Sequence, residues 1–140
     1  ARGARGDRWC AVSAREPWAN EPEGGEGVEA GLAWTVKRCV FQSGSWHWCG
    51  YVDLPAGHPW VGLDLAWSAP EALSVHGGIT YQEQNAGGVR IGFDCAHSGD
   101  RRANDEHESP ADSGCEFRTY EYVRGEVTEL ARQCAKAARS

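Results

Sequence analysis

The C-terminal end of the sequence constrains the fold most strongly, because apolar side chains recur there at every third or fourth residue. The recurring positions are Tyr120, Val123, Val127, Leu130, Cys134 and Ala137. This spacing places them on one face of an α-helix, and charged side chains occupy the opposite face. Acidic residues gather early and basic residues late, which complements the helix dipole. We therefore expect an amphipathic helix that packs its apolar stripe against a sheet.

The middle of the sequence predicts that sheet. Residues 34–42 are rich in Val, Trp and Phe, a Ser-Gly-Ser turn follows, and residues 46–54 continue as a partner strand. A second hairpin is predicted from residues 73–83 and 89–95, which flank the turn-forming sequence QNAGG. The predicted fold class is α+β: an antiparallel sheet of about four to six strands with a C-terminal helix packed on one face.

A length of 140 residues is the size of one domain. Residues 1–31 are first basic, then acidic and Gly-rich, and they lack a hydrophobic period. We expect them to form a poorly structured N-terminal segment and residues 32–140 to form a single α+β domain. Residues 98–115 are polar without a period, which predicts a long surface loop.

The charge and hydropathy patterns exclude several classes of function. Fourteen basic and twenty acidic side chains give a net charge of −6, which does not fit a protein that binds nucleic-acid backbones. No stretch approaches the run of about eighteen apolar residues that a membrane span requires. No apolar segment follows the basic start to make a signal peptide. We expect no nucleic-acid or membrane partner and a cytoplasmic location.

The six cysteines do not form a C-x-x-C motif, which disfavours zinc fingers, zinc ribbons and thioredoxin-like sites. Cys39 and Cys49 lie symmetrically about Gly44, so a hairpin that turns there would bring them together. The pair would be either a cross-strand disulfide or two packed thiols. Reduced thiols are the expectation for an intracellular chain.

Side chains capable of catalysis or metal binding are concentrated in two short motifs, VHGGITY and GFDCAHSGD. These motifs belong to the two strands of the second predicted hairpin. If the loop between these strands has an even number of residues, His76, Cys95 and His97 share one face of the hairpin. Asp94 then points to the other face. If the loop is odd, or a bulge intervenes, Asp94 lies beside His76 instead.

Each register implies a different site. With an even loop, His76 and His97 converge and Asp100 reaches them from the following loop, and this ligand set suits a divalent transition metal. With an odd loop, Asp94 orients His76 as a general base. A Cys–His nucleophile pair that uses Cys95 is a third possibility.

Three further residues are candidates for ligand binding. Gly77 and Gly78 would let a substrate approach the backbone and meet free N–H donors. His58, between a Gly and a Pro, would reach the site from one end of the sheet. Purely structural roles are the alternative for the candidate site residues. A lone His is often a hydrogen-bonded scaffold residue, and Asp94 can cap a turn.

The motifs CGYVDLPAGHPW, VHGGITY and GFDCAHSGD precede a helix that begins near EYVRGEVTELA. In this order they resemble a small family of proteins encoded by phages and prophages of high-GC bacteria. The resemblance covers about residues 46–135. The family has no assigned function, so the resemblance implies an intracellular accessory protein and no particular reaction.

Together, these observations predict a small accessory enzyme, a hydrolase that acts on a small molecule. His76 would be base or metal ligand, Asp94 its orienting partner, and His97 with Asp100 would complete the site. The main alternative is a non-catalytic module that binds a small molecule or a host protein, and a structural phage component is the third.

Overall fold

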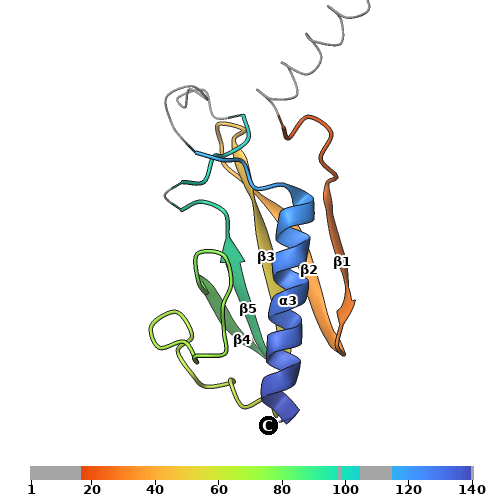
Figure 1. Ribbon diagram of the computed structural model, residues 1–140, viewed down its shortest axis with the longest axis vertical. Helices are drawn as coiled ribbons and strands as arrows, with labels where there is room; N and C mark the ends of the chain where they lie inside the picture. Colours follow the sequence, from red (N-terminus) through yellow and green to blue (C-terminus); the bar gives the residue numbers. More distant parts are fainter. Residues whose placement is uncertain (1–16, 98, 105–114, 140) are drawn as a thin grey trace, which may run out of the picture.

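The computed structural model describes residues 17–97, 99–104 and 115–139. Its elements are β1 Gly24–Glu29, β2 Leu32–Val40, β3 Trp46–Pro55, β4 Tyr81–Asn85, β5 Gly88–Asp94 and α3 Tyr120–Arg139. The strands form one five-stranded sheet in the order β1-β2-β3-β5-β4, with every neighbouring pair antiparallel (Figure 1). The predicted α+β fold class is confirmed.

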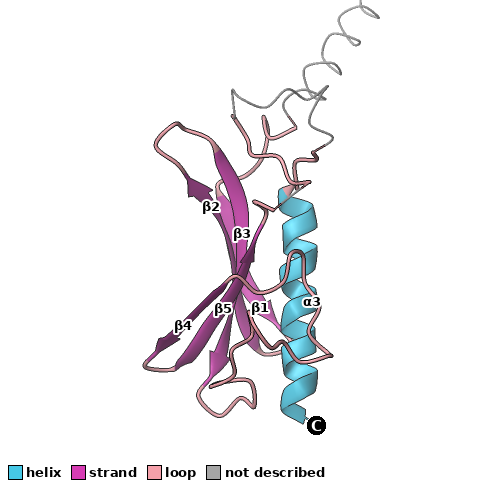
Figure 2. Cartoon of the chain, turned by 90° about the vertical axis from the view of Figure 1, so that its left-hand side faces the viewer, coloured by secondary structure: helices cyan, strands magenta, loops and turns pink. Residues whose placement is uncertain are grey.

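Helix α3 covers one face of the sheet, and no helix of the described residues covers the other (Figure 2). The predicted apolar stripe lies on the buried face of α3. Four of its members are buried, Val123, Val127, Leu130 and Cys134, and Tyr120 and Ala137 are partly buried against the core. Ala131 and Ala135 complete the buried face. Within the part of the chain that the structure describes, no helix combines the length and apolar character that crossing a bilayer requires.

Large aromatic side chains fill the core between α3 and the sheet. On β3, Trp46 and Trp48 meet edge to face, with ring centroids 5.0 Å apart. Trp48 also contacts Tyr120 at the start of α3, and Trp46 contacts Phe117 just before it. Since side chains alternate along a strand, His47 and Cys49 of β3 point to the open face.

The expectation of little regular structure before Leu32 is wrong for the described part of that segment, because β1 occupies Gly24–Glu29. Strand β1 joins β2 through a two-residue turn at Ala30 and Gly31, which have φ angles of 53° and 84°. Such a turn brings two adjacent strands together even when one is rich in glycine. Residues 1–16 lie outside the described residues.

The second predicted hairpin is present, but its first strand is much shorter than expected. Strand β4 begins at Tyr81, and Asn85 pairs with Gly88 across a two-residue turn, which is the even register. Residues 73–80 form turns beside α3 instead of a strand. Gly77 and Gly78 explain the break, because their φ angles of 69° and 78° are incompatible with an extended strand.

Cys39 and Cys49 form a disulfide, so the expectation of reduced thiols is wrong. The two cysteines are diagonal neighbours, since Cys39 lies opposite His47 and Cys49 lies opposite Lys37. Their Cα atoms are 6.5 Å apart. The hairpin geometry therefore suits a disulfide, and the expectation had rested on the presumed compartment alone.

The packing of α3 yields a direct test of its orientation. Leu130→Asp should lower the free energy of unfolding by more than about 3 kcal/mol, because it places a charge in the fully buried stripe. Glu129→Ala, one residue earlier on the exposed face, should change it by less than about 0.5 kcal/mol. Thermal and urea unfolding of both variants would measure this, and equal losses would mean that the wrong face has been assigned.

Candidate functional site

Three segments meet beside the N-terminal half of α3: the turns at residues 73–80, the chain that follows β5, and α3 itself (Figure 1). The first segment is tied to the helix by the backbone N–H of His76, which donates to Glu126 Oε1 at 2.7 Å. The second places His97 and Asp100 next to it, with the imidazole centroids of His76 and His97 6.0 Å apart. The site thus combines groups that are distant in the sequence.

The carboxylate of Asp100 is the centre of the site, and its side chain is only 1% exposed. Oδ1 accepts a hydrogen bond from Arg118 Nε at 2.9 Å. Oδ2 accepts one from His76 Nε2 at 2.8 Å and one from the backbone N–H of His97 at 3.1 Å. Each oxygen is therefore satisfied, as a buried carboxylate requires.

These partners decide the charge of Asp100. Burial on its own raises the pKa of the carboxyl group, but the hydrogen bonds from His76, Arg118 and the His97 backbone outweigh it. The pKa consequently lies below its ordinary value of 3.8. Asp100 is an anion at neutral pH.

His76 lies between Asp100 and a tyrosine of the helix. With Nε2 bonded to the Asp100 carboxylate, Nδ1 is 2.8 Å from the hydroxyl of Tyr122. The carboxylate favours the tautomer that carries its proton on Nε2, so Nδ1 accepts a hydrogen bond from Tyr122. Burial, followed by the charge of Glu126, raises the pKa of Tyr122, which keeps the phenol protonated.

His97 contributes a second imidazole with a free nitrogen. Its Nδ1 lies 3.4 Å from Asp94 Oδ1 and 3.8 Å from Asp100 Oδ2, and it has no hydrogen-bond partner among the described residues. The side chain as a whole is about one-third exposed, but Nδ1 itself is buried, so other atoms of the ring face solvent.

The structure places Asp94 beside His97 and not beside His76. Asp94 accepts hydrogen bonds from Thr80 Oγ1 at 2.8 Å and from the backbone N–H of Ala96 at 3.1 Å. The odd register that would have paired Asp94 with His76 does not occur. Asp100 occupies the orienting position predicted for Asp94.

Gly78 does not supply the free N–H donor that the sequence suggested. Gly78 donates its N–H to Val75 within a turn, at 2.9 Å. Gly77 is a steric requirement, since a Cβ there would lie 2.4 Å from the His97 ring. Their contribution is to place His97 and to turn the chain.

His58 does not join the site. It is buried, its Nε2 bonds the carbonyl of Cys134 at 2.7 Å, and its Nδ1 accepts from the backbone N–H of Trp60. Cys134 is twelve positions beyond Tyr122 on α3, a distance of roughly 18 Å along a helix. His58 anchors the other end of the helix.

Cys95 does not act as a nucleophile, because it is buried and burial raises the pKa of its thiol far above the range of a nucleophile.

His76, His97 and Asp100 bring three potential metal-ligand atoms within 4.8 Å of one another. Their donor types fit a divalent transition metal. The guanidinium of Arg118 opposes a cation here, because it already neutralises the Asp100 carboxylate. The same arrangement orients His76 as a base without any metal.

Sequence reasoning missed the contribution of α3. Arg118, Tyr122 and Glu126 reach the site at intervals of four residues, which places Tyr122 and Glu126 on one side of the helix. Arg118 lies just before the helix, which begins at Tyr120. These polar side chains recur every four residues beside the apolar stripe, and that spacing in the sequence could have predicted that they share one side of the helix.

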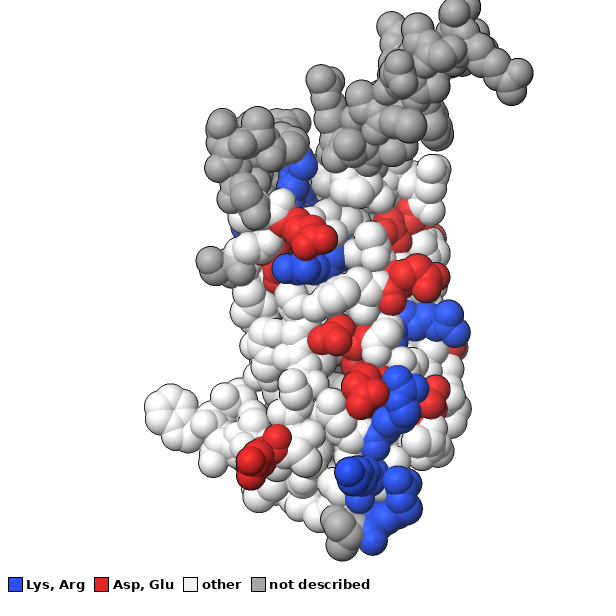
Figure 3. Space-filling model, viewed as in Figure 1, with Lys and Arg blue, Asp and Glu red and all other residues white. Residues whose placement is uncertain are grey.

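A separate hollow of the described surface lies away from this site. A groove of about 970 Å³ lies at the C-terminal end of α3, lined by Trp60, Arg132 and Lys136 among others. Figure 3 shows basic side chains gathered at this end of the molecule. The groove does not include His76, His97 or Asp100. The chemistry of the side chains, and not the size of a hollow, identifies the candidate site.

Comparisons of the chain with protein-family models, with curated proteins and with solved structures found no match.

Asp100→Asn tests the role of the carboxylate through its pH dependence. At pH 7 the variant should be about 1–3 kcal/mol less stable, because Arg118 and His76 lose a charged partner. A lowered pKa stabilises the fold above about pH 4 and loses that effect as the pH falls through the folded-state value. The difference in unfolding free energy between wild type and variant should therefore shrink in acid. A difference independent of pH would contradict the assignment.

The paired glycines provide a matched comparison. An alanine at either position has a left-handed backbone, which costs about 1–2 kcal/mol. Nothing lies within 4 Å of a Cβ at Gly78, whereas one at Gly77 overlaps His97. We expect Gly77→Ala to be the less stable variant and to shift the imidazole NMR signals of His97, with Gly78→Ala leaving them in place. Equal shifts in both would show that Gly77 does not position His97.

Proposed function

We propose that this protein is a hydrolase that acts on a small molecule by general acid–base catalysis, with His76 as the base. The supporting observation is the continuous hydrogen-bonded line from Asp100 through His76 to Tyr122. A carboxylate that orients an imidazole and stabilises its protonated form is a recurring feature of acid–base catalysis. The resemblance of the motifs supports the further proposal that the enzyme serves a phage or prophage.

Tyr122 is the outer end of this line, because it is 38% exposed while the His76 side chain is 13% exposed. In the proposed step, a water molecule attacks the substrate and gives a proton to the Tyr122 oxygen. The phenolic proton passes at the same time to His76 Nδ1. Asp100 stabilises the resulting imidazolium, and the proton returns by the same route to the leaving group.

His97 is proposed to bind the substrate from the opposite side. About one-third of its side chain is exposed and the two rings are 6.0 Å apart, so a ligand that approaches His76 would also meet the exposed part of the His97 ring. The guanidinium carbon of Arg118 lies 5.3 Å from the centroid of the Tyr122 ring. Its positive charge would therefore stabilise negative charge that develops near the phenol in the transition state. This arrangement suits ester or phosphoester substrates, whose hydrolysis develops such charge.

The test is hydrolysis of a panel of chromogenic small esters and phosphoesters by the full chain. His76→Asn and Tyr122→Phe should lower the rate at least about 100-fold, with melting temperatures within a few degrees of wild type. His97→Asn should also abolish activity if it binds the substrate. A chelator should leave the rate unchanged, and loss of activity on chelation would favour the metal-dependent alternative.

Tyr81→Phe is the matched control, because Tyr81 is 37% exposed and contacts Glu83 on the open face, away from His76. It should keep the wild-type rate. Full activity in both His76→Asn and His97→Asn would show that the cluster is scaffold. Absence of hydrolysis together with stoichiometric binding of a small molecule would favour the binding module.

A further inference from the structure

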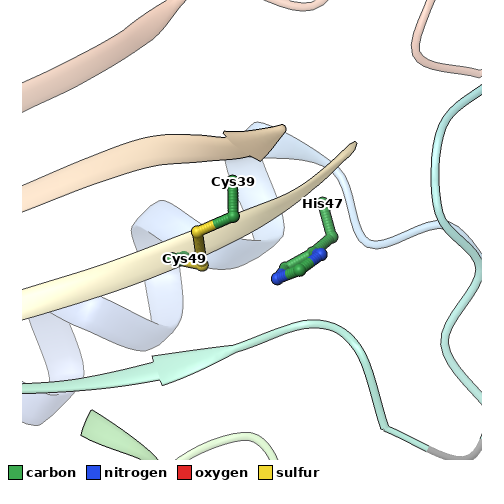
Figure 4. A group of neighbouring side chains, drawn as sticks. All are labelled: Cys39, His47 and Cys49. Carbon is green, nitrogen blue, oxygen red and sulfur yellow. A yellow bond between two sulfur atoms is a disulfide. The ribbon is translucent and has the colours of Figure 1, made fainter. Parts of the chain in front are cut away.

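A second cluster of metal-ligating side chains lies on the open face of the sheet. Cys39 of β2 is the cross-strand partner of His47 of β3, and Cys49 lies two residues further along β3. All three side chains consequently share one face. Their potential ligand atoms lie within 4.8 Å of one another, and Figure 4 shows the imidazole beside the sulfur pair.

His47 is the unusual member of this cluster. The residue is only 7% exposed, and its Nδ1 is buried without a hydrogen-bond partner among the described residues. Buried polar atoms in proteins are almost always bonded, so this nitrogen needs an explanation.

Two thiolates and one imidazole are ligands that Zn²⁺ prefers, with a fourth position open to water. In a tetrahedral site with Zn–S distances near 2.3 Å, two sulfurs are about 3.8 Å apart. The Cα atoms of Cys39 and Cys49, at 6.5 Å, leave room for that separation once the disulfide is reduced. Cys39 is only partly buried, so an ion can enter past it.

We propose that Cys39, His47 and Cys49 form a redox-gated zinc site, which binds Zn²⁺ in the reduced chain and releases it when the disulfide forms. A dithiol reductant breaks the S–S bond, supplies two electrons and two protons, and becomes a disulfide itself. Zn²⁺ then displaces the two thiol protons, which pass to solvent. A disulfide oxidant takes two electrons from the thiolates, forms the S–S bond again and expels the ion.

Cobalt titration of the full chain tests this site, because bonds from thiolate to Co²⁺ give a charge-transfer absorption that nitrogen and oxygen ligands do not. After reduction with a phosphine under anaerobic conditions, one equivalent of Co²⁺ should produce this band and Zn²⁺ should abolish it. The oxidised chain should show no band. This comparison uses the wild-type protein and does not depend on the folding of a variant.

Variants then assign the ligands. Cys49→Ser and His47→Asn should each weaken Co²⁺ binding by more than about tenfold, while circular dichroism confirms that they fold. Cys115→Ser removes a thiol outside the cluster, and His76→Asn disrupts the other candidate metal cluster, so both should keep the band. A reduced wild type without the band, or an unchanged band in Cys49→Ser, would overturn the proposal.

Discussion

The buried carboxylate of Asp100 holds together the part of the molecule where chemistry is concentrated. It connects Arg118, just before α3, with His76 in the turns at residues 73–80 and with the backbone of His97 after β5. A buried carboxylate without any partner would be strongly destabilising, and these donors together offset that cost. The same bonds that make the anion tolerable also set the tautomer of His76. Stability and the proposed catalysis consequently depend on one group.

The sequence predicted the framework well, because the framework depends on local periodicity. The stripe through Leu130 identified the helix, and the turn residues around Gly87 identified the hairpin but left its register open; the structure settles the register as even. Asp100 was recognised only as a companion of the histidines, since nothing local indicates that Arg118 lies against it. Residues 73–80 were assigned to a strand because their apolar alternation outweighed the Gly77-Gly78 pair, whose left-handed backbone becomes evident only in three dimensions.

The two faces of the sheet carry different chemistry. The face toward α3 leads to the oxygen- and nitrogen-rich site around His76, while the open face carries the sulfur atoms of Cys39 and Cys49 beside His47. A permanent disulfide is typical of oxidising compartments, which conflicts with the predicted cytoplasmic location. The proposed pair, which would exchange a disulfide for a bound ion, is compatible with either compartment. The hairpin register that aligns Cys39 with His47 is the feature on which the proposed exchange depends.

The most direct test of the central role of Asp100 is the titration of its carboxyl group, followed by the ¹³C chemical shift of that carbon. We predict a pKa below the ordinary value of 3.8, together with an His76 imidazole that carries its proton on Nε2. A carboxyl pKa at or above the ordinary value would contradict the claim. Burial would then outweigh the hydrogen bonds, and Asp100 could not orient His76 as proposed.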